Sequence, residues 1–252
     1  MSVVEALPTR SLTVRLAASN EDLVAAQRLR WDVFFDGLGA ARSADGPGLD
    51  IDPYDALCDH LLVEDNGRAV GTYRLLRKSV AAAHSGFYSA GEYCLDQLGS
   101  DQNEWLELGR SCVAPGYRDA GTIQLLWRGI AAYLHDHDIS LMFGCASFHG
   151  TDPHDHAASL SYLYHNHLAP RDMRARALDA RHVDMAMLPM GGYDQRRALR
   201  MLPPLIKGYL RVGAMVGDGA VIDHDFNTVD VFMIMPVAQI SARYLERFGT
   251  AA

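Results

Sequence analysis

A stretch that passes from strand to turn to helix constrains this chain more than any other, and it spans residues 105–122, WLELGRSCVAPGYRDAGT. Apolar and polar residues alternate from Trp105 onward, which predicts a strand. Pro115 and Gly116 interrupt the alternation, and an amphipathic helix is predicted from about Ile123. The predicted strand therefore leads through a glycine-bearing turn directly into a helix N-terminus.

The turn runs from Arg118 to Thr122 and contains Gly121. A glycine-bearing turn before a helix presents backbone N–H groups to an anion, which is usually a phosphate. We therefore expect Arg118, Gly121 and Thr122 to bind an anionic group.

Glu107 and Arg110 lie three residues apart on the predicted strand. Strand alternation places residues at this spacing on opposite faces of a sheet. Either a β-bulge brings the carboxylate and the guanidinium to one side, or the two side chains serve different sides. The spacing leaves both arrangements open.

Chain length and composition indicate one globular domain. The chain has 252 residues, of which 49% are hydrophobic, so a sizeable core can be buried. We predict loose tails at 1–11 and 241–252 and a single domain over 12–240, with a C-terminal extension from about 170. The net charge of −8 argues against nucleic acid as a partner.

The four cysteines are widely spaced and form no CxxC pair, which favours reduced thiols over a disulfide framework. The first residues lack the pattern of a signal peptide, and no run of about 18 uncharged apolar residues is present. We therefore expect a cytoplasmic location. The histidines include HDH twice but no HExxH, so we expect no bound metal.

Strand and helix patterns alternate along the rest of the chain, which predicts an α/β fold. Asp65-Asn66-Gly67 is typical of a hairpin turn, and Asn20 is a suitable N-cap. The predicted strands are 12–16, 60–63, 70–76, 139–148 and 231–235; the predicted helices are 20–35, 123–135 and 159–167; the segment 202–216 is amphipathic.

Two groups of charged residues allow more than one interpretation. Arg30 lies at the edge of an apolar helix face, either as a surface arginine that snorkels or as an inward anion ligand. The loop that follows this helix is a solvated turn, a calcium loop, or a pocket whose carboxylates attract a cationic substrate. Its acidic residues are Asp50, Asp52, Asp55 and Asp59.

Several longer blocks resemble one family: CDHLLVED, VGTYRLL, GFYSAGEY, LELGRSCV, LLWRGIAAYL, LMFGCASFHGTDP and LIKGYLRVGAMVGDGAVIDHDFNTVDV. With these blocks the chain resembles the L-ornithine Nα-acyltransferases, relatives of the acyl-homoserine-lactone synthases within the GNAT superfamily. The resemblance covers roughly 20–236. It implies a GNAT-type acyltransferase fold with a mixed central sheet flanked by helices.

The wider synthase pattern resembles this sequence residue by residue, as R-x-x-x-F, D-x-[FY]-D, R-L-L and E-x-x-R. The matching residues are Arg30 and Phe34; Asp52, Tyr54 and Asp55; Arg74, Leu75 and Leu76; and Glu107 and Arg110. One departure concerns the turn: the superfamily places a small residue where this chain has Ile123, so the phosphate cradle is expected to be partial or rearranged.

The resemblance implies an enzyme of lipid biosynthesis that transfers a long-chain 3-hydroxyacyl group from acyl carrier protein to the α-amine of ornithine. No bound cofactor is implied, since the donor is the 4′-phosphopantetheinyl carrier protein. Glu107 is the candidate base, acting directly or through water, and Arg110 is the other candidate catalytic residue. Because an ordinary glutamate has a pKa of about 4.3, the pairing with an amine requires burial to raise it.

Other roles follow from the same resemblance. Arg30, Arg74 and Arg110 hold the substrate carboxylate or brace the acidic loop, and Asp52 and Asp55 bind the side-chain ammonium. Backbone N–H groups near Cys112 and Val113 stabilise the oxyanion, and Arg118 with the turn holds the pantetheine phosphate. The competing interpretation is that these acids and arginines form a structural ion-pair network; Cys112 as a nucleophile is a further alternative.

Three alternatives to ornithine acylation remain: an N-acyl amino acid synthase for another amine such as glutamine, an acyl-homoserine-lactone synthase, and a non-catalytic lipid-binding or membrane-interaction protein of the same fold.

The segment 171–200 is rich in arginine and is either a solvated face or a dock for an acidic partner or an anionic membrane, such as the inner membrane. Its arginines are Arg171, Arg174, Arg176, Arg181, Arg196, Arg197 and Arg200.

Overall fold

Two neighbouring parallel strands, β5 (Glu104–Val113) and β6 (Ile139–His149), form the centre of the protein. The structure is a computed structural model that describes residues 10–37, 40, 48–99 and 103–240. Within these residues the strands follow the order β1-β2-β3-β5-β6-β9-β8-β7-β4. The outer strands are β1 (Leu12–Leu16), β2 (Asp59–Asp65), β3 (Arg68–Arg77), β4 (Tyr93–Cys94), β7 (Arg176–Ala177), β8 (Met215–Asp223) and β9 (Thr228–Pro236).

The β2–β3 hairpin closes where the sequence predicted it. Asn66 and Gly67 have φ angles of 50° and 81°, the left-handed conformations that a two-residue hairpin turn requires. β1 also has the predicted bounds and pairs antiparallel with β2. These local predictions are confirmed because alternation and turn chemistry agree.

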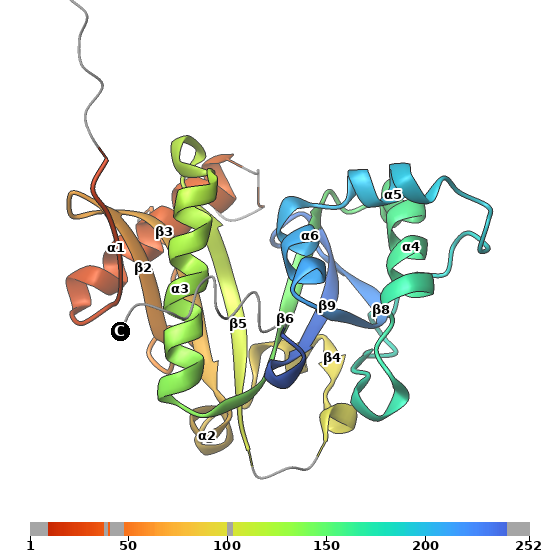
Figure 1. Ribbon diagram of the computed structural model, residues 1–252, viewed down its shortest axis with the longest axis horizontal. Coiled ribbons are helices and arrows are strands. Elements are labelled where there is room, and N and C mark those ends of the chain that lie inside the picture. The colour runs from red at the N-terminus through yellow and green to blue at the C-terminus, as the bar shows by residue number, and fades with distance from the viewer. Residues whose placement is uncertain (1–9, 38–39, 41–47, 100–102, 241–252) are drawn as a thin grey trace, which may run out of the picture.

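Helices cover both faces of the β1–β5 half. Leu61 of β2 approaches Gly129 on α3 (Ala120–Asp136), which lies in front of this half in Figure 1. The neighbouring His60 points to the other face, where its Nε2 lies 2.9 Å from the carbonyl oxygen of Asp55. That second face carries α1 (Asn20–Trp31), which packs against β3 and β5.

The ends of α1 and α3 differ from the predicted ends. Ser19 caps α1 by accepting the N–H of Asp22, so Asn20 is the first helical residue, and a π-helix over Asp32–Gly37 follows. α3 begins at Ala120 rather than at about Ile123, because Asp119 is its N-cap. Ile123, expected on the buried stripe, is 41% exposed.

β5 and β6 pair from Glu104 and Ile139 to Glu107 and Phe143, and beyond that point they diverge. Figure 1 shows the two strands opening as a V. Gly144 lies at the vertex, where a Cβ atom would come within 2.1 Å of the carbonyl oxygen of Leu108. This close approach requires glycine, since any side chain would push the strands apart.

The C-terminal half adds strands to β6 and helices beside them. β9 pairs antiparallel with both β6 and β8. The predicted amphipathic segment 202–216 contains one short helix and then the start of β8, a strand that the sequence analysis did not predict. The remaining helices are α2 (Lys78–Ala83), α4 (Ala157–His167), α5 (Gln195–Met201) and α6 (Pro204–Arg211).

The predicted tails lie outside the described residues except for Arg10 and Ser11. These two residues contact Asp119 and Asp65. The predicted α/β class is confirmed. Among the helices that the structure describes, none has the length and apolar composition needed to cross a membrane.

Candidate functional site

A β-bulge at Arg110 shapes the inner wall of the V. The β3–β5 register passes from Gly109 opposite Arg74 to Cys112 opposite Thr72, and Arg110 has a φ of 50°. Both Glu107 and Arg110 consequently contact Tyr88: Glu107 Oε2 accepts its backbone N–H at 2.8 Å, and the guanidinium of Arg110 lies 5.0 Å from its ring centre. Of the two predicted arrangements, the bulge is the one observed.

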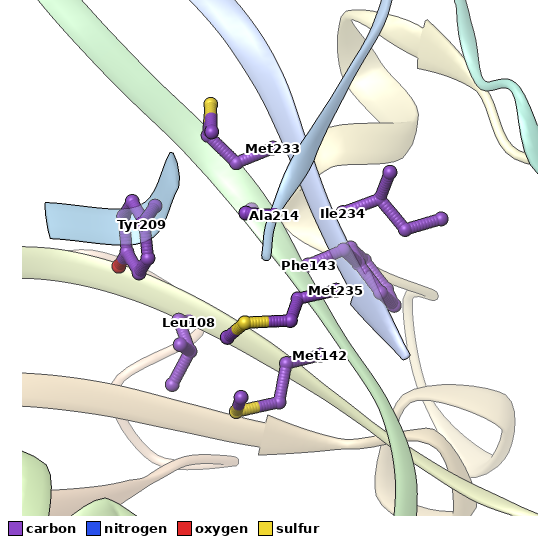
Figure 2. A pocket seen from close by; sticks show the side chains of 9 residues that line it. Leu108, Met142, Phe143, Tyr209, Ala214, Met233, Ile234 and Met235 are labelled. Atoms are coloured by element: carbon purple, nitrogen blue, oxygen red, sulfur yellow. The ribbon is translucent and has the colours of Figure 1, made fainter. Parts of the chain in front are cut away.

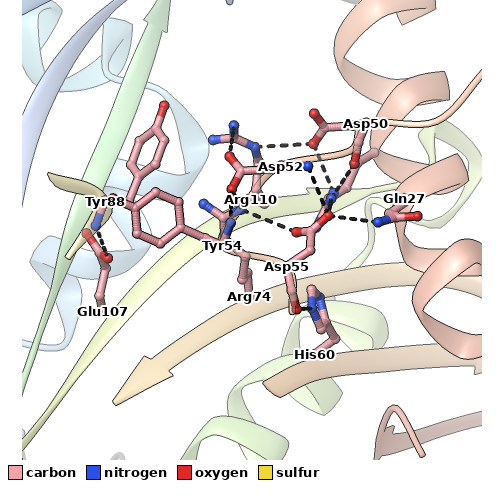
Figure 3. Close-up of polar contacts among 11 residues, drawn as sticks. Gln27, Asp50, Asp52, Tyr54, Asp55, His60, Arg74, Tyr88, Glu107 and Arg110 are labelled. Carbon is pink, nitrogen blue, oxygen red and sulfur yellow. Dashed lines mark hydrogen bonds and ion pairs between the residues drawn. The ribbon is translucent and has the colours of Figure 1, made fainter. Parts of the chain in front are cut away.

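Arg30 is fully buried and pairs with Asp50 and Asp55, which Figure 3 labels, so it is an anion ligand rather than a surface arginine. Its Nε lies 3.0 Å from Asp50 Oδ2, and its Nη2 lies 2.6 Å from Asp55 Oδ2. Burial alone would raise the pKa of Asp55, but the hydrogen bond and charge of Arg30 outweigh it and hold this pKa at about 2. The pair locks the acidic loop against α1.

Arg74 and Arg110 complete the arrangement. Arg74 Nη1 lies 2.9 Å from Asp52 Oδ1 and 3.3 Å from Asp55 Oδ1. Arg110 Nε lies 3.2 Å from Asp50 Oδ2, and its Nη2 lies 3.0 Å from Asp52 Oδ2. We call these residues the ion-pair network: Arg30, Asp50, Asp52, Asp55, Arg74 and Arg110.

Charges in the ion-pair network are balanced, with three arginines facing three aspartates. The carboxylates of Asp52 and Asp55, predicted to bind an ammonium, are engaged by guanidinium groups. This geometry favours the alternative in which the arginines brace the acidic loop. Removing one member would leave a buried charge uncompensated.

Glu107 is buried and holds the turn that follows α2. Besides Tyr88, Ser89 donates its backbone N–H to Oε1 at 2.7 Å and its hydroxyl to the same oxygen. Burial raises the pKa of Glu107, and the hydrogen bonds from Ser89 and Tyr88 oppose that rise. A base that takes a proton from an amine requires a pKa above that of an ordinary glutamate, and the raised pKa of Glu107 meets this requirement.

A pocket fills the V between β5 and β6 and encloses about 960 Å³ of space, its open mouth included. We call it the splay pocket. One wall carries Arg110 and the opposite wall carries Asp223 and Asp230, so the pocket is cationic on one side and acidic on the other. Its remaining lining residues are Phe34, Tyr88, Ser111, Cys145, Ala146, Ser147, Leu205, Phe226 and Thr228.

The acidic wall continues into a carboxylate cluster. Oxygen atoms of Glu92, Asp223 and Asp230 lie within 4.8 Å of one another, and we call these residues the acidic cluster. Burial raises the pKa of Glu92 to about 7, with the charge of Asp230 adding to the effect. Burial likewise raises the pKa of Asp230 to about 6.

A second, apolar pocket lies at the vertex of the V and is narrow, its space of about 250 Å³ including open solvent (Figure 2). We call it the methionine pocket, because Met142, Met233 and Met235 contribute to its wall. Flexible thioether side chains adapt to apolar ligands of different shape. The remaining lining residues are Leu108, Phe143, Gly144, Tyr209, Ala214 and Ile234.

The residues predicted to hold the pantetheine arm lie apart from the splay pocket lining. At the start of α3 the backbone N–H of Thr122 donates to the carboxylate of Asp119 at 3.1 Å, so this N–H is already engaged. Arg118 Nε donates to the carbonyl oxygen of Val113 at 3.1 Å, and Gly121 is exposed. Cys112 is buried, and burial raises the pKa of its thiol to about 12, which disfavours the nucleophile alternative.

Sequence reasoning missed the acidic cluster, Tyr88 and Ser89. A signal for one of them was present: Asp230 interrupts an otherwise apolar strand, TVDVFMIM. A carboxylate in such a run is costly to bury and therefore points to a specific role. Glu92 and Asp223 come from other segments, and only the tertiary structure brings them to Asp230.

Comparisons with known proteins show the family to which this chain belongs. Residues 29–128 match the family model described as an acetyltransferase (GNAT) domain. L-ornithine N(alpha)-acyltransferase of Brucella abortus (strain 2308) is 48% identical over 96% of this chain and 90% of that protein. The protein of the same name from Agrobacterium fabrum is 44% identical over 96% of this chain and 86% of its own length.

Solved structures with the same fold include the AHL synthase LasI, with a TM-score of 0.52, 15% identity, and coverage of 97% of this chain and 98% of that one. FeeM, an N-acyl amino acid synthase from uncultured soil microbes, has a TM-score of 0.52 and 10% sequence identity, and the match covers 96% of this chain and 100% of that one. These likenesses confirm the predicted GNAT-type fold. The sequence identities go further, and the chain belongs to the L-ornithine N(alpha)-acyltransferase family of GNAT acyltransferases.

Proposed function

We propose that this protein transfers a long-chain 3-hydroxyacyl group from acyl carrier protein to the α-amine of L-ornithine, the first step of ornithine-lipid synthesis. The observation that carries this proposal is the 48% identity, over 96% of the chain, to a protein named L-ornithine N(alpha)-acyltransferase. The assignment of acyl carrier protein as the donor and of a 3-hydroxyacyl chain as the transferred group rests on the family resemblance.

The reaction is an aminolysis of a thioester. The amine nitrogen attacks the thioester carbon, a C–N bond forms, the C–S bond breaks, and the pantetheine thiol leaves. The amine loses a proton, which a base must accept. The thiol has a pKa near 8.5, so it needs little help from an acid.

The splay pocket suits an amino-acid acceptor. Arg110 on one wall would meet the α-carboxylate beside its existing partners Asp50 and Asp52, since a guanidinium has five N–H donors and these two contacts use only some of them. Asp223 and Asp230 on the other wall favour cationic groups. A zwitterion that carries an additional ammonium matches this distribution of charge.

Glu107 accepts the proton through Ser89 in our proposal. Cys145 lies on the pocket wall and its thiol donates to Ser89 Oγ at 3.7 Å, while the Ser89 hydroxyl donates to Glu107 Oε1. Cys145 would accept the amine proton and pass its thiol proton to Ser89, which passes its hydroxyl proton to Glu107, so Cys145 and Ser89 end unchanged and Glu107 holds the proton. This chain of polar groups links the pocket to the carboxylate of Glu107. Burial raises the pKa of that carboxylate. Glu107 thus meets the acceptor indirectly, through the thiol of Cys145 and the hydroxyl of Ser89.

The methionine pocket would receive the acyl chain, because its lining is apolar and its residues Phe143 and Gly144 directly precede Cys145 of the splay pocket on β6. Its methionine side chains would have to move to make room for a long chain. Arg118 and the start of α3 stay our proposal for the pantetheine phosphate, with Gly121 and Thr122; the carboxylate of Asp119 restricts that site.

Carrier protein would dock on the surface of α5. Arg196, Arg197 and Arg200 are exposed there, and acidic partners are attracted by such a cluster. Exposed apolar side chains lie nearby in sequence, Met190 at 66%, Leu199 at 42% and Met201 at 65%. The combination also suits contact with an anionic membrane, where the lipid product is released.

A product assay tests the proposal. The protein is incubated with 3-hydroxypalmitoyl carrier protein and a panel of amines that includes ornithine, glutamine and S-adenosylmethionine, and products are read by mass spectrometry. N-acylornithine is the expected product. Acylglutamine or an acyl-homoserine lactone in its place would select one of the enzyme alternatives, and no product with any amine would favour the lipid-binding alternative.

A further inference from the structure

The acidic cluster differs from the ion-pair network in its balance of charge. Arginines neutralise Asp50, Asp52 and Asp55, whereas the cluster contains three carboxylates. Arg181 approaches Glu92 at 3.7 Å but is half exposed. Negative charge is therefore left over at the acidic wall of the splay pocket.

Two polar atoms beside the cluster are buried and lack a hydrogen-bond partner among the described residues. They are Asp230 Oδ1 and Thr228 Oγ1. Both residues are only 7% exposed, and both line the splay pocket. Burial raises the pKa of Asp230, and the hydroxyls of Ser147 and Thr228 lower it, so of these two atoms Asp230 Oδ1 is the buried acceptor that a donor from a ligand would satisfy.

The positions of the three carboxylates are fixed by the fold. Asp230 lies on β9, opposite Ser147 of β6. Asp223 ends β8, where its Oδ1 accepts backbone N–H groups from Asp225 and Phe226. Glu92 precedes β4, and its Oε2 lies 3.3 Å from Cys145 Sγ. Three separate segments thus hold carboxylates together, and burial and this proximity raise the pKa values of Glu92 and Asp230, which favours a compensating cation over three bare charges.

We infer that the acidic cluster is the subsite for the side-chain ammonium of the acceptor amino acid. It determines which amino acid serves as the acceptor. An alkylammonium has three N–H donors, which match three converging carboxylates. Arg110 on the facing wall then binds the α-carboxylate. The inference rests on the proposed function and specifies how the same pocket recognises its acceptor.

This subsite selects diamino acids. L-norvaline has the carbon skeleton of L-ornithine without the side-chain amine, so it would leave the carboxylates unpaired in the pocket. A site built to bind a polar group discriminates strongly against an analogue that lacks it, and we expect a preference on the order of 10²-fold or more. Glutamine, with a neutral side-chain amide, is disfavoured for the same reason.

The test compares ornithine and norvaline as acceptors for Asp230→Asn, Asp223→Asn and Glu92→Gln. Each variant should lower kcat/KM for ornithine roughly 10- to 100-fold, mainly through KM, and leave kcat/KM for norvaline within about twofold. Asp225→Asn is the matched control, because it removes an exposed carboxylate from the same turn. Calorimetry should show weaker binding of ornithine, but not of norvaline, to the same variants.

Several outcomes would overturn the inference. These are equal use of both amines by the wild type, an equal loss with both amines in the variants, or retention of a divalent cation that the variants release. Absence of acyl transfer to any amine would refute the proposed function alone, since calorimetry with ornithine still measures the subsite. Circular dichroism confirms that each variant is folded.

Discussion

Tyr88 donates its backbone N–H to Glu107 Oε2 at 2.8 Å, and its ring faces the guanidinium of Arg110. The two ends of the predicted E-x-x-R motif therefore meet on one residue from a distant segment. Burial raises the pKa of Tyr88 to about 12, so the phenol stays neutral at the pocket wall. Tyr88 links the base proposed for the reaction to the cation that faces the acceptor.

Glu107→Gln tests the proton path. We expect kcat to fall on the order of 10²-fold and the acid limb of the kcat–pH profile to disappear. Wild-type activity should rise with pH through the raised pKa of Glu107, because only the ionised carboxylate accepts a proton. The KM for ornithine should change little.

Glu104→Gln is the control on the same strand. Glu104 Oε1 accepts one N–H, from Ser79 at 2.8 Å, and a glutamine carbonyl retains that bond. Ser89→Ala should reproduce much of the loss in kcat, since the relay hydroxyl is removed. An acid limb that persists in Glu107→Gln would remove the carboxylate from the proton path and leave it the task of holding Tyr88 and Ser89.

Arg30→Ala tests the ion-pair network. The change leaves Asp50 and Asp55 buried beside fewer cations, so we expect the free energy of unfolding to fall by about 3–5 kcal/mol in urea. Arg28→Ala, an exposed position on the same helix, should change it by less than about 0.5 kcal/mol. Equal and small effects of the two substitutions would show that the buried aspartates are not left uncompensated when Arg30 is removed.

Local sequence patterns were sufficient for some elements and not for others. β1 and the β2–β3 hairpin were predicted because alternation and an Asn-Gly turn act within a few residues. β8 was missed, since Gly217 and Gly219 and a register shift between Val216 and Ala220 disturb its alternation. β4 and β7 are two residues long and exist through pairing with each other, which no local pattern records.

The candidate site divides in the same way. The family pattern placed Arg30, Asp52, Asp55, Arg74 and Arg110 in one region, and the structure brings them together. The pairing of each arginine with a particular aspartate depends on distances of a few ångströms. A sequence does not contain these distances. The acidic cluster forms from segments far apart in the chain, so its excess charge becomes visible only after folding.

Asp230→Asn should stabilise the protein in a pH-dependent manner. The folded-state pKa of Asp230 is raised to about 6, above the unfolded value of about 3.9, so ionised Asp230 destabilises the fold. This penalty is absent below about pH 4, grows between pH 4 and 6, and is complete above that range. It amounts to something on the order of 3 kcal/mol.

Thermal unfolding across pH measures this effect. The variant should match the wild type at pH 4 and exceed it in Tm at pH 8, without ornithine in the buffer. Asp225→Asn should follow the wild type at every pH, because its carboxylate is exposed. A gap in Tm that is the same at all pH values would show that Asp230 does not change its ionisation on folding.

Charge reversal on α5 tests the carrier-protein dock. The triple substitution of Arg196, Arg197 and Arg200 to Glu should weaken binding of carrier protein by about tenfold or more at low salt and less at high salt, because exposed charges are screened. As a control, Arg28, Arg68 and Arg128 are reversed on α1, β3 and α3, where they are exposed. Net charge changes equally in both proteins, so a loss confined to the α5 variant locates the dock on that helix. An unchanged dissociation constant at low salt would place the dock elsewhere.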